Sequence, residues 1–579
     1  MKPILHKLNL LLDKKQKRTM FLLMLMMVVG AFLQTAGVGL LVEVVNVVID
    51  PEAVAGSRLV GTIYRMAGSP DFRSFSVTVM LLLIATFVVK NLFMFLQLKA
   101  MFSFVYTNQF RTSERMMRNY LRRHYEFYLN ADTAVVQRSI TSDVNNMYAL
   151  ILCLLQLMSD GVVSFFVVAY CFLKNGVMTV ILAVVMILLM VVVKKVLKPI
   201  MYKAGKDNQD YYSGLFKQIS QAVQGIKDIK ITGKESYFVE EYRKCGKGYV
   251  DAVQKYSLYN NIPKLLMETV CVATMMLFMI WQILSGVQTD NMMEMLSTLA
   301  AAAYVLLPAV NRINNQINSM AYFEPFFMGV ADNLQDEISG EKVDFAEFER
   351  PVEKMPVKHM IELKNVTYSY PGTDKLIFDH ADLQVPVGKA VGIVGTTGAG
   401  KSTVVDIMLG LLKQQEGSVL ADGVDIMTNY RGWLKNVGFV PQVSTMLDDT
   451  IRKNIAFGVP EKEIDENRIW EVLREAQLED FVKSLPEGLE TGIGERGIRL
   501  SGGQRQRISI ARALYDDPEV LILDEATSAV DNDTEAAIME SINHFQGKKT
   551  LLIIAHRLQT IEKCDIVYRV ENGKVKRER

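Results

Sequence analysis

The 579-residue sequence has few cysteines and almost no net charge. Its cysteines are Cys153, Cys171, Cys245, Cys271 and Cys564. Their odd number and wide spacing argue against a disulfide framework or a cysteine-bound metal, so we interpret them as inert thiols. The 64 lysines and arginines nearly balance the 63 aspartates and glutamates, and the formal charge of +1 indicates no nucleic-acid partner. No internal repeat is present, so each module occurs once.

Hydrophobic residues make up 50% of the chain, and their distribution divides it in two. Nearly all long apolar runs precede about residue 330, whereas the rest alternates like a soluble α/β domain. We predict a membrane α-helical domain over residues 1–335, a charged linker over 336–358 and an α/β domain over 359–579.

About six membrane-spanning helices are expected, since a helix needs roughly 20 apolar residues to cross a bilayer. Their starts lie near Met20, Phe75, Met147, Val177, Ile262 and Met292. The N-terminal segment and the connections after the second and fourth spans are basic, which places both termini in the cytoplasm. We expect these connections to be helices that leave the membrane, with tips near residues 133–142 and 225–235 contacting a cytoplasmic domain. Two solvated helical hairpins are the alternative.

A phosphate-binding loop is indicated where a short apolar strand runs into the pattern G-x-x-x-x-G-K-S-T and then into a helical run. The residues of this candidate ATP site are Gly395, Thr396, Thr397, Gly398, Ala399, Gly400, Lys401, Ser402 and Thr403. Glycines let backbone N–H groups close around phosphates at the positive end of a helix. Lys401 should reach the β- and γ-phosphates of ATP, and the Ser402 hydroxyl should take one Mg²⁺ position.

Two carboxylates, Asp524 and Glu525, end a second apolar run at residues 520–523. A parallel strand beside the phosphate loop would bring Asp524 to the Mg²⁺ through water. Glu525 would then stand where a water attacking the γ-phosphate is activated or oriented. Without the loop, paired acids at a strand end would indicate solvated charges only.

The segment Leu500-Ser501-Gly502-Gly503-Gln504, which opens a helical run, resembles the signature of ABC ATPases. The resemblance implies roles for further positions in family order. Tyr370 resembles the aromatic residue that stacks on adenine, and Gln442 resembles the glutamine that contacts Mg²⁺ and the attacking water. Asp531 lies in a loop like the one that crosses the dimer interface, and His556 resembles the histidine that contacts the γ-phosphate.

An export direction and a dimer follow from the same resemblance. Gly494-Glu495-Arg496-Gly497 resembles a short element typical of ABC exporters, and importers carry their membrane subunits on separate chains. In the family, ATP lies between the phosphate loop of one subunit and the signature of the other. Ser501 and Gly503 would complete the site built on Lys401 of the partner subunit. Because every motif is intact, a homodimer with two working sites is expected.

The whole chain resembles bacterial flippases for lipid-linked oligosaccharides of the protein-glycosylation type. Shared features are Gly225-Ile-Lys-Asp-Ile-Lys, Leu307-Pro308-Ala-Val-Asn311-Arg312-Ile and the ending Cys564-Asp-Ile-Val-Tyr-Arg. The resemblance implies a bacterial cytoplasmic-membrane protein whose cargo is a polyprenyl-pyrophosphate glycan. Val305 departs from the group, which often has a basic residue near that position.

Three cations, Lys90, Lys264 and Arg312, lie in or near the second, fifth and sixth spans. Charges at membrane depth cost at least ~2.5–3.5 kcal/mol each on insertion scales, so they usually face a wet cavity or a partner. We predict that they form a substrate site for an anionic pyrophosphate. The alternatives are snorkelling to the interface or pairing with Glu43, Asp160 or Glu268.

Other functions remain open at this point. Residues 59–66 of the first external loop have rough helical spacing and would lie near a lipid tail or simply pack. The chain could instead export peptides, drugs or other lipids, or act as an ATP-gated channel or regulator without transport. Intact Glu525, Gly502 and Gly503 argue against the last class.

Overall fold

The computed structural model describes residues 2–49, 72–174, 176–284, 290–334, 352–525, 540, 542, 544–555 and 561–579. The chain forms two compact units. The helical unit comprises Met1–Arg123 and Ala131–Val343, and the sheet unit comprises His124–Asn130 and Asp344–Arg579.

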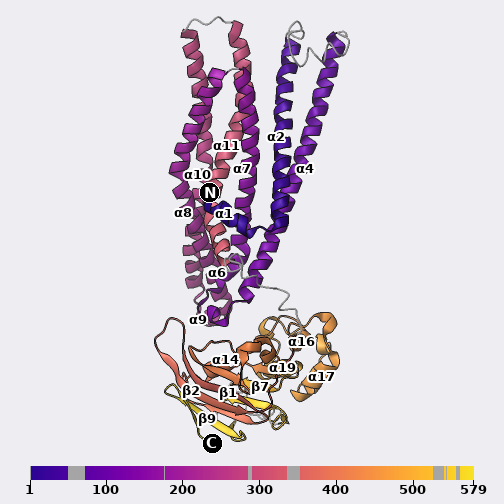
Figure 1. The fold of residues 1–579 in the computed structure, drawn as a ribbon, viewed down its shortest axis with the longest axis vertical. Helices are drawn as coiled ribbons and strands as arrows, with labels where there is room; N and C mark the ends of the chain where they lie inside the picture. The colour runs from indigo at the N-terminus through magenta and orange to yellow at the C-terminus, as the bar shows by residue number, and fades with distance from the viewer. Residues whose placement is uncertain are drawn as a thin grey trace. The chain divides into compact units, whose positions relative to one another are not determined.

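Long helices joined by short ones build the helical unit (Figure 1). They are α1 (Lys2–Leu11), α2 (Lys14–Ile49), α4 (Phe72–Leu121), α6 (Thr133–Arg138), the π-helix η2 (Ser139–Asp143), α7 (Val144–Lys174), α8 (Gly176–Gln224), α9 (Ile226–Thr232), α10 (Glu235–Leu284) and α11 (Asp290–Asn333). Within the described residues, five stretches are long and apolar enough to cross a membrane, in α2, α4, α6–α7, α8 and α10. With α11 as a further long helix, the arrangement agrees with the expected set of spans.

Proline does not end these helices. Pro199 lies inside α8, Pro263 inside α10, and Pro308 and Pro325 inside α11. A proline removes one helical hydrogen bond, which neighbouring helices and polar side chains compensate in membrane helices. The spans therefore continue as long helices beyond the apolar runs from which they were predicted.

Helices α8 and α11 meet backbone to backbone at Gly205. A Cβ atom added there would lie 2.0 Å from the carbonyl oxygen of Tyr322, so no residue with a side chain fits at this position. Tyr322 also stacks on Tyr256 of α10, with ring centroids 4.0 Å apart. Glycine at residue 205 thus permits the backbones of α8 and α11 to approach closely, and the stacked aromatic rings stabilise this packing.

One short helix outside the membrane region, α5 (Tyr125–Asn130), belongs to the sheet unit. The carboxylate of Glu126 accepts a hydrogen bond from the backbone N–H of Lys413 at 3.0 Å. This tip was predicted near residues 133–142, which instead form α6 and η2 of the helical unit. The chain turns directly after the basic run that ends at Arg123, earlier than predicted. The second expected tip contains α9, which stays within the helical unit.

Two sheets organise the described part of the sheet unit. Six strands follow the order β10-β9-β3-β8-β7-β6, and four antiparallel strands follow β2-β1-β4-β5. The strands are β1 (Met360–Ser369), β2 (Leu376–Pro386), β3 (Ala390–Val394), β4 (Glu416–Ala421), β5 (Val424–Asp425), β6 (Val437–Val440), β7 (Val520–Asp524), β8 (Thr550–Ile554), β9 (Ile566–Glu571) and β10 (Lys574–Arg577). The α-helices are α14 (Lys401–Met408), α15 (Tyr430–Leu434), α16 (Ile451–Ile455), α17 (Glu466–Glu475), α18 (Glu479–Ser484) and α19 (Gly502–Tyr515).

The six-stranded sheet is covered on both faces. Strands β3, β7 and β8 are buried along their whole length, as expected for parallel strands between two layers. Successive residues enter opposite cores: Leu521 packs with Ile508 of α19, whereas Ile522 packs with Val404 of α14. The indole Nε1 of buried Trp433 donates to the Met408 carbonyl at 3.0 Å, which joins α15 to α14. The predicted α/β class is confirmed.

Candidate nucleotide site and membrane cations

The phosphate loop connects β3 to α14. Gly398 and Gly400 have φ angles of +80° and +103°, which side-chain-bearing residues rarely adopt. Gly395 passes so close to the neighbouring strand β9 that a Cβ atom would lie 2.5 Å from the Val570 carbonyl oxygen. The glycines therefore shape a tight loop that ends at the first turn of a helix, where backbone N–H groups can donate to phosphate oxygens.

Lys401 lies across this loop. Its ammonium group donates to the carbonyl oxygens of Gly395 at 3.1 Å and Thr396 at 3.2 Å, and the residue is only 5% exposed. A buried ammonium held by neutral carbonyls can exchange them for a more strongly accepting anion. This placement suits the predicted contact with the phosphates of ATP.

Two of the three predicted magnesium ligands, Ser402 and Asp524, contact each other. The Ser402 hydroxyl lies 3.3 Å from the Oδ1 atom of Asp524 at the end of β7. Strand β7 is not adjacent to β3 in the sheet, because β8 lies between them. The phosphate-loop helix spans this gap and still brings Ser402 to Asp524. Hydroxyl and carboxylate oxygens at this spacing fit a hard cation such as Mg²⁺.

Gln442 and Glu525 follow neighbouring strands, since β6 pairs with β7 in parallel register. The Gln442 side-chain amide donates to the Glu525 carboxylate at 2.7 Å. Glu525 has a φ angle of +49°, which is unusual for a residue with a side chain, and its N–H donates to the Ile554 carbonyl at 3.1 Å. Both contacts hold the carboxylate at the edge of the sheet in a strained conformation, as often occurs at functional sites.

The predicted adenine-stacking residue adjoins the same loop. The Tyr370 hydroxyl lies 3.0 Å from the Thr403 hydroxyl, and its ring meets Tyr368 edge to face at a centroid distance of 5.4 Å. Tyr368 is fully buried, and burial, followed by the nearby charge of Glu126, raises its pKa to about 12. Tyr370 itself is half-buried.

Sequence reasoning did not single out Asp406. This carboxylate lies on α14, and burial together with the negative charge of Asp524 raises its pKa to about 6. The signal was present in the sequence, because Asp406 interrupts an otherwise apolar helical run at residues 404–412. It adds negative charge close to the predicted cation site.

The signature segment caps α19. Ser501 is the N-cap residue: its hydroxyl accepts from the Gln504 N–H at 3.2 Å, and its own N–H donates to the Gln504 side chain at 2.8 Å. Ser501 is exposed, whereas Gly503 is buried. Among the described residues, no hydrogen bond joins these side chains to the phosphate loop. Asp531 and His556 lie outside the described residues.

The three membrane cations are on different helices: Lys90 on α4, Lys264 on α10 and Arg312 on α11. Arg312 donates to Asp160 of α7 at 2.8 Å, one of the pairings left open above. The Lys90 ammonium lies 4.3 Å from the ring centroid of Phe87, and Lys264 is exposed. The charge of Arg312 is therefore balanced within the chain. Residues 59–66 and the side chains of Glu43 and Val305 lie outside the described part of the structure.

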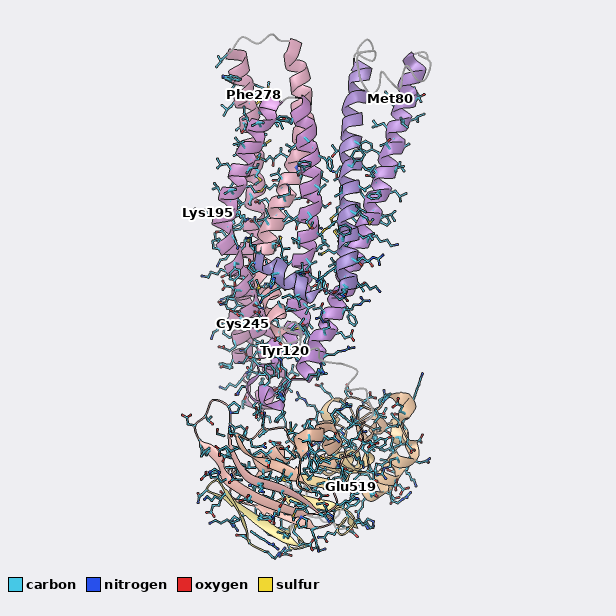
Figure 2. The ribbon with its side chains drawn as sticks, viewed as in Figure 1. Met80, Tyr120, Lys195, Cys245, Phe278 and Glu519 are labelled. Carbon is cyan, nitrogen blue, oxygen red and sulfur yellow. The ribbon has the colours of Figure 1, made fainter. Side chains whose placement is uncertain are left out.

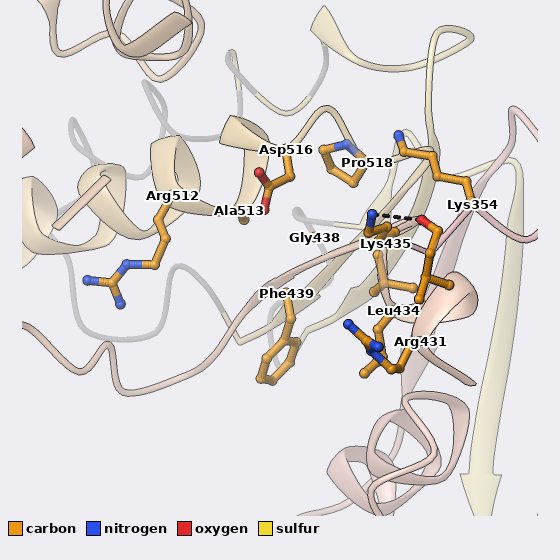
Figure 3. Close-up of a pocket in the computed structure, with 12 residues that line it drawn as sticks. Lys354, Arg431, Leu434, Lys435, Gly438, Phe439, Arg512, Ala513, Asp516 and Pro518 are labelled. Atoms are coloured by element: carbon orange, nitrogen blue, oxygen red, sulfur yellow. Dashed lines mark hydrogen bonds between the residues drawn. The ribbon is translucent and has the colours of Figure 1, made fainter. Parts of the chain in front are cut away.

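A separate cavity of about 590 Å³ lies along the edge strand β6 (Figure 3). Its cations already have partners: Lys354 donates to the Asp517 carbonyl and Lys435 to the Val352 carbonyl, each at 2.7 Å. Arg512 points away from the other labelled side chains and donates to the Thr445 carbonyl at 2.8 Å. The cavity contains none of the predicted ATP-site residues, so it is distinct from the nucleotide site.

The sheet unit contains a phosphate loop, a Ser402–Asp524 pair suited to Mg²⁺, and a glutamate that is hydrogen-bonded to Gln442. Together with the long apolar helices, these features define an ATPase coupled to a membrane domain. Residues 20–305 match the ABC transporter transmembrane region, and residues 378–528 match the ABC transporter family. The ATP-dependent lipid A-core flippase of Desulfotalea psychrophila is 30% identical over 464 residues, or 78% of each chain. That of Cupriavidus metallidurans is 28% identical over 474 residues, covering 78% of this chain and 75% of the relative.

The fold also matches a solved structure described as a bacterial Atm1-family ABC exporter with ATP bound. The TM-score is 0.76 at 22% identity, over 97% of this chain and 95% of the other. The chain belongs to the ABC transporter family. It is an ATP-driven exporter of the half-transporter type, with one membrane domain and one ATPase domain.

Proposed function

We propose that this exporter flips an anionic lipid-linked oligosaccharide, carried on a polyprenyl pyrophosphate, across the bacterial cytoplasmic membrane, and that it works as a homodimer. The hydrolytic part rests on one observation, the 2.7 Å contact between Gln442 and Glu525 beside the Ser402–Asp524 pair. Glu525 orients or deprotonates the attacking water, and Gln442 holds its carboxylate in place.

Each remaining residue of the site has a role in binding ATP. Lys401 and the loop N–H groups bind the phosphates, and Tyr370 stacks on adenine. Bound through Ser402, Gln442 and Asp524, Mg²⁺ would neutralise negative charge on the phosphates. Asp531 and His556 keep the roles that the family resemblance implies for them.

A second copy is needed to complete the ATP site. Ser501 is exposed at the start of α19 and makes no hydrogen bond to the phosphate loop within the described residues. The short helix α9 also presents apolar side chains to solvent, with Ile226 51% and Ile231 73% exposed. Exposed apolar groups at a cytoplasmic tip favour a protein partner. A two-fold symmetric homodimer would provide one for both features.

The choice of cargo rests on the family resemblance and on charge. Lys90 and Lys264 would contact the pyrophosphate, whereas Arg312 is balanced by Asp160 and contributes as part of an ion pair. The flippase names of the relatives support a lipid cargo in general. They equally favour a second candidate, another anionic glycolipid of the lipid A-core kind.

Reconstitution separates the two candidates. The full-length protein would be placed in liposomes with either a polyprenyl-pyrophosphate glycan or lipid A-core, and ATP-dependent change of leaflet measured for each. Flipping of the first alone supports the proposal, and flipping of the second alone replaces it. Glu525→Gln serves as the control without turnover. Lys90→Gln/Lys264→Gln should abolish flipping while sparing basal ATP hydrolysis, because the hydrolytic groups lie in the sheet unit.

A further inference from the structure

A small cavity of about 140 Å³ lies in the helical unit between α1, α8 and α11. Lys194 and Lys198 of α8 and Asn318 and Glu324 of α11 supply its polar lining. Apolar side chains, including Ile4 of α1, supply the rest. The cavity therefore has a polar side and an apolar side, as an amphiphile does.

The polar side of the cavity has more hydrogen-bond donors than acceptors. Asn318 is only 1% exposed, and its side-chain amino group has no hydrogen-bond partner. Lys198 lies 3.9 Å from the Glu324 carboxylate, at the outer limit of an ion pair, and Lys194 adds a second positive charge. Two cations face one carboxylate. A buried amide donor without an acceptor is rare and marks a place for a ligand or for water.

The depth of the cavity follows from α8. Its apolar run at residues 177–193 ends directly before Lys194, and the connection that follows is basic. Lysines at the end of such a run lie at the cytoplasmic interface of the bilayer. Helix α1, which closes one side, is held in place by the Lys7–Asp332 ion pair and by Arg115, which donates to the Leu11 carbonyl at 3.2 Å.

We propose that this cavity binds the phosphate group of an anionic amphiphile in the cytoplasmic leaflet, with its acyl or polyprenyl chain along the apolar side. A cavity of about 150 Å³ accommodates a molecule the size of benzene, so a phosphate fits and an oligosaccharide does not. The inference rests on the membrane position of α8 and is independent of the oligosaccharide assignment. A resident phospholipid and the phosphate of a transported lipid share this chemistry.

Binding is tested by native mass spectrometry of the purified full-length protein with phosphatidylglycerol, phosphatidylcholine or a polyprenyl phosphate. Wild-type protein should bind at least one of the two anionic lipids more tightly than phosphatidylcholine. Lys194→Gln/Lys198→Gln should weaken that binding at least about tenfold, since charge-assisted hydrogen bonds are lost. The matched control is Lys195→Gln, an exposed lysine of the same helix (Figure 2) that does not line the cavity and should leave binding unchanged.

Two further variants reverse or isolate the effect. Glu324→Gln removes the opposing charge and should tighten binding. Asn318→Asp keeps the shape of the side chain while replacing the donor by an anion, so it should weaken binding without opening a cavity. It also tests the proposal if the double lysine variant does not fold.

The two anionic probes distinguish the sources. Loss of phosphatidylglycerol binding alone assigns the cavity to a resident phospholipid, and loss of polyprenyl phosphate binding together with flipping assigns it to the transported lipid. The proposal is overturned if both probes bind the lysine variant and Asn318→Asp as tightly as wild type. It is also overturned if phosphatidylcholine binds wild type as tightly as both anionic lipids.

Discussion

The side-chain amide of Gln442 donates to the Glu525 carboxylate at 2.7 Å, although 82 residues separate them in the chain. The pairing of β6 with β7 creates this contact, because both residues lie just beyond the carboxyl ends of adjacent strands. Movement of the loop that carries Gln442 would therefore move the partner of the proposed base.

Glu525→Gln should bind ATP but lose nearly all turnover, by about 10²–10⁴-fold, because the amide keeps the shape of the side chain and cannot act as a base. Steady-state hydrolysis and retention of labelled ATP measure the two properties. The control is Glu519→Gln, which neutralises an exposed carboxylate directly before β7 and should remain active. Near wild-type hydrolysis in Glu525→Gln would remove Glu525 from its proposed role.

Ser501→Ala and Lys401→Ala should complement each other partially when co-expressed. A mixed dimer would place both defects in one composite site and leave the other site intact, whereas each mutant alone damages both sites. Activity is measured on dimers purified through two different tags. If the mixed dimer is no more active than either parent and ATP also fails to dimerise the wild-type protein's ATPase domains, the shared site is wrong.

Arg312→Gln should lower the stability of the helical unit by about 1.5–3 kcal/mol, because it removes a charge-assisted hydrogen bond and leaves Asp160 without its partner. The double variant Arg312→Gln/Asp160→Asn should recover much of this loss. The thermal midpoint of the purified protein reports both effects. Midpoints equal to that of the wild type in both variants would show that the pair contributes nothing to stability.

Asp406→Asn should stabilise the sheet unit at neutral pH. Burial and the charge of Asp524 raise the Asp406 pKa from its ordinary value of 3.8 to about 6, so the folded state binds the proton more tightly than the unfolded chain. The free energy of unfolding therefore falls as the pH rises through this window and stays lower above it. Asp406→Asn removes this loss, so it should raise the free energy of unfolding at pH 7.5. The increase should nearly vanish below pH 4, at about the ordinary pKa range of carboxyl groups.

Thermal unfolding in a chelating buffer measures this gain, since bound cations would change the charge near Asp524. Asp374→Asn, which neutralises an exposed carboxylate, is the control and should leave the midpoint nearly unchanged at both pH values. A gain from Asp406→Asn that is independent of pH would contradict the assigned cause.

Local patterns predicted the parts of the site that depend on local sequence. The phosphate loop had to contain glycine at residues 398 and 400, because the backbone there has positive φ angles. The position of β8 between β3 and β7 could not be predicted from local patterns, because strand order depends on pairing between distant segments. The pairing of Arg312 with Asp160 was likewise decided by the packing of α7 on α11. The first cytoplasmic tip lies earlier in the chain than predicted, because the chain turns directly after Arg123. The pattern of apolar residues does not indicate this turn.

The contact at Gly205 has a mechanical consequence. With no side chain between the backbones of α8 and α11, neither helix can rotate or slide against the other without a steric clash. Helices α8 and α11 should therefore move as one rigid body, with any hinge at residues away from this crossing. Spin labels placed on α8 and α11 close to Gly205 should keep a constant separation throughout the transport cycle.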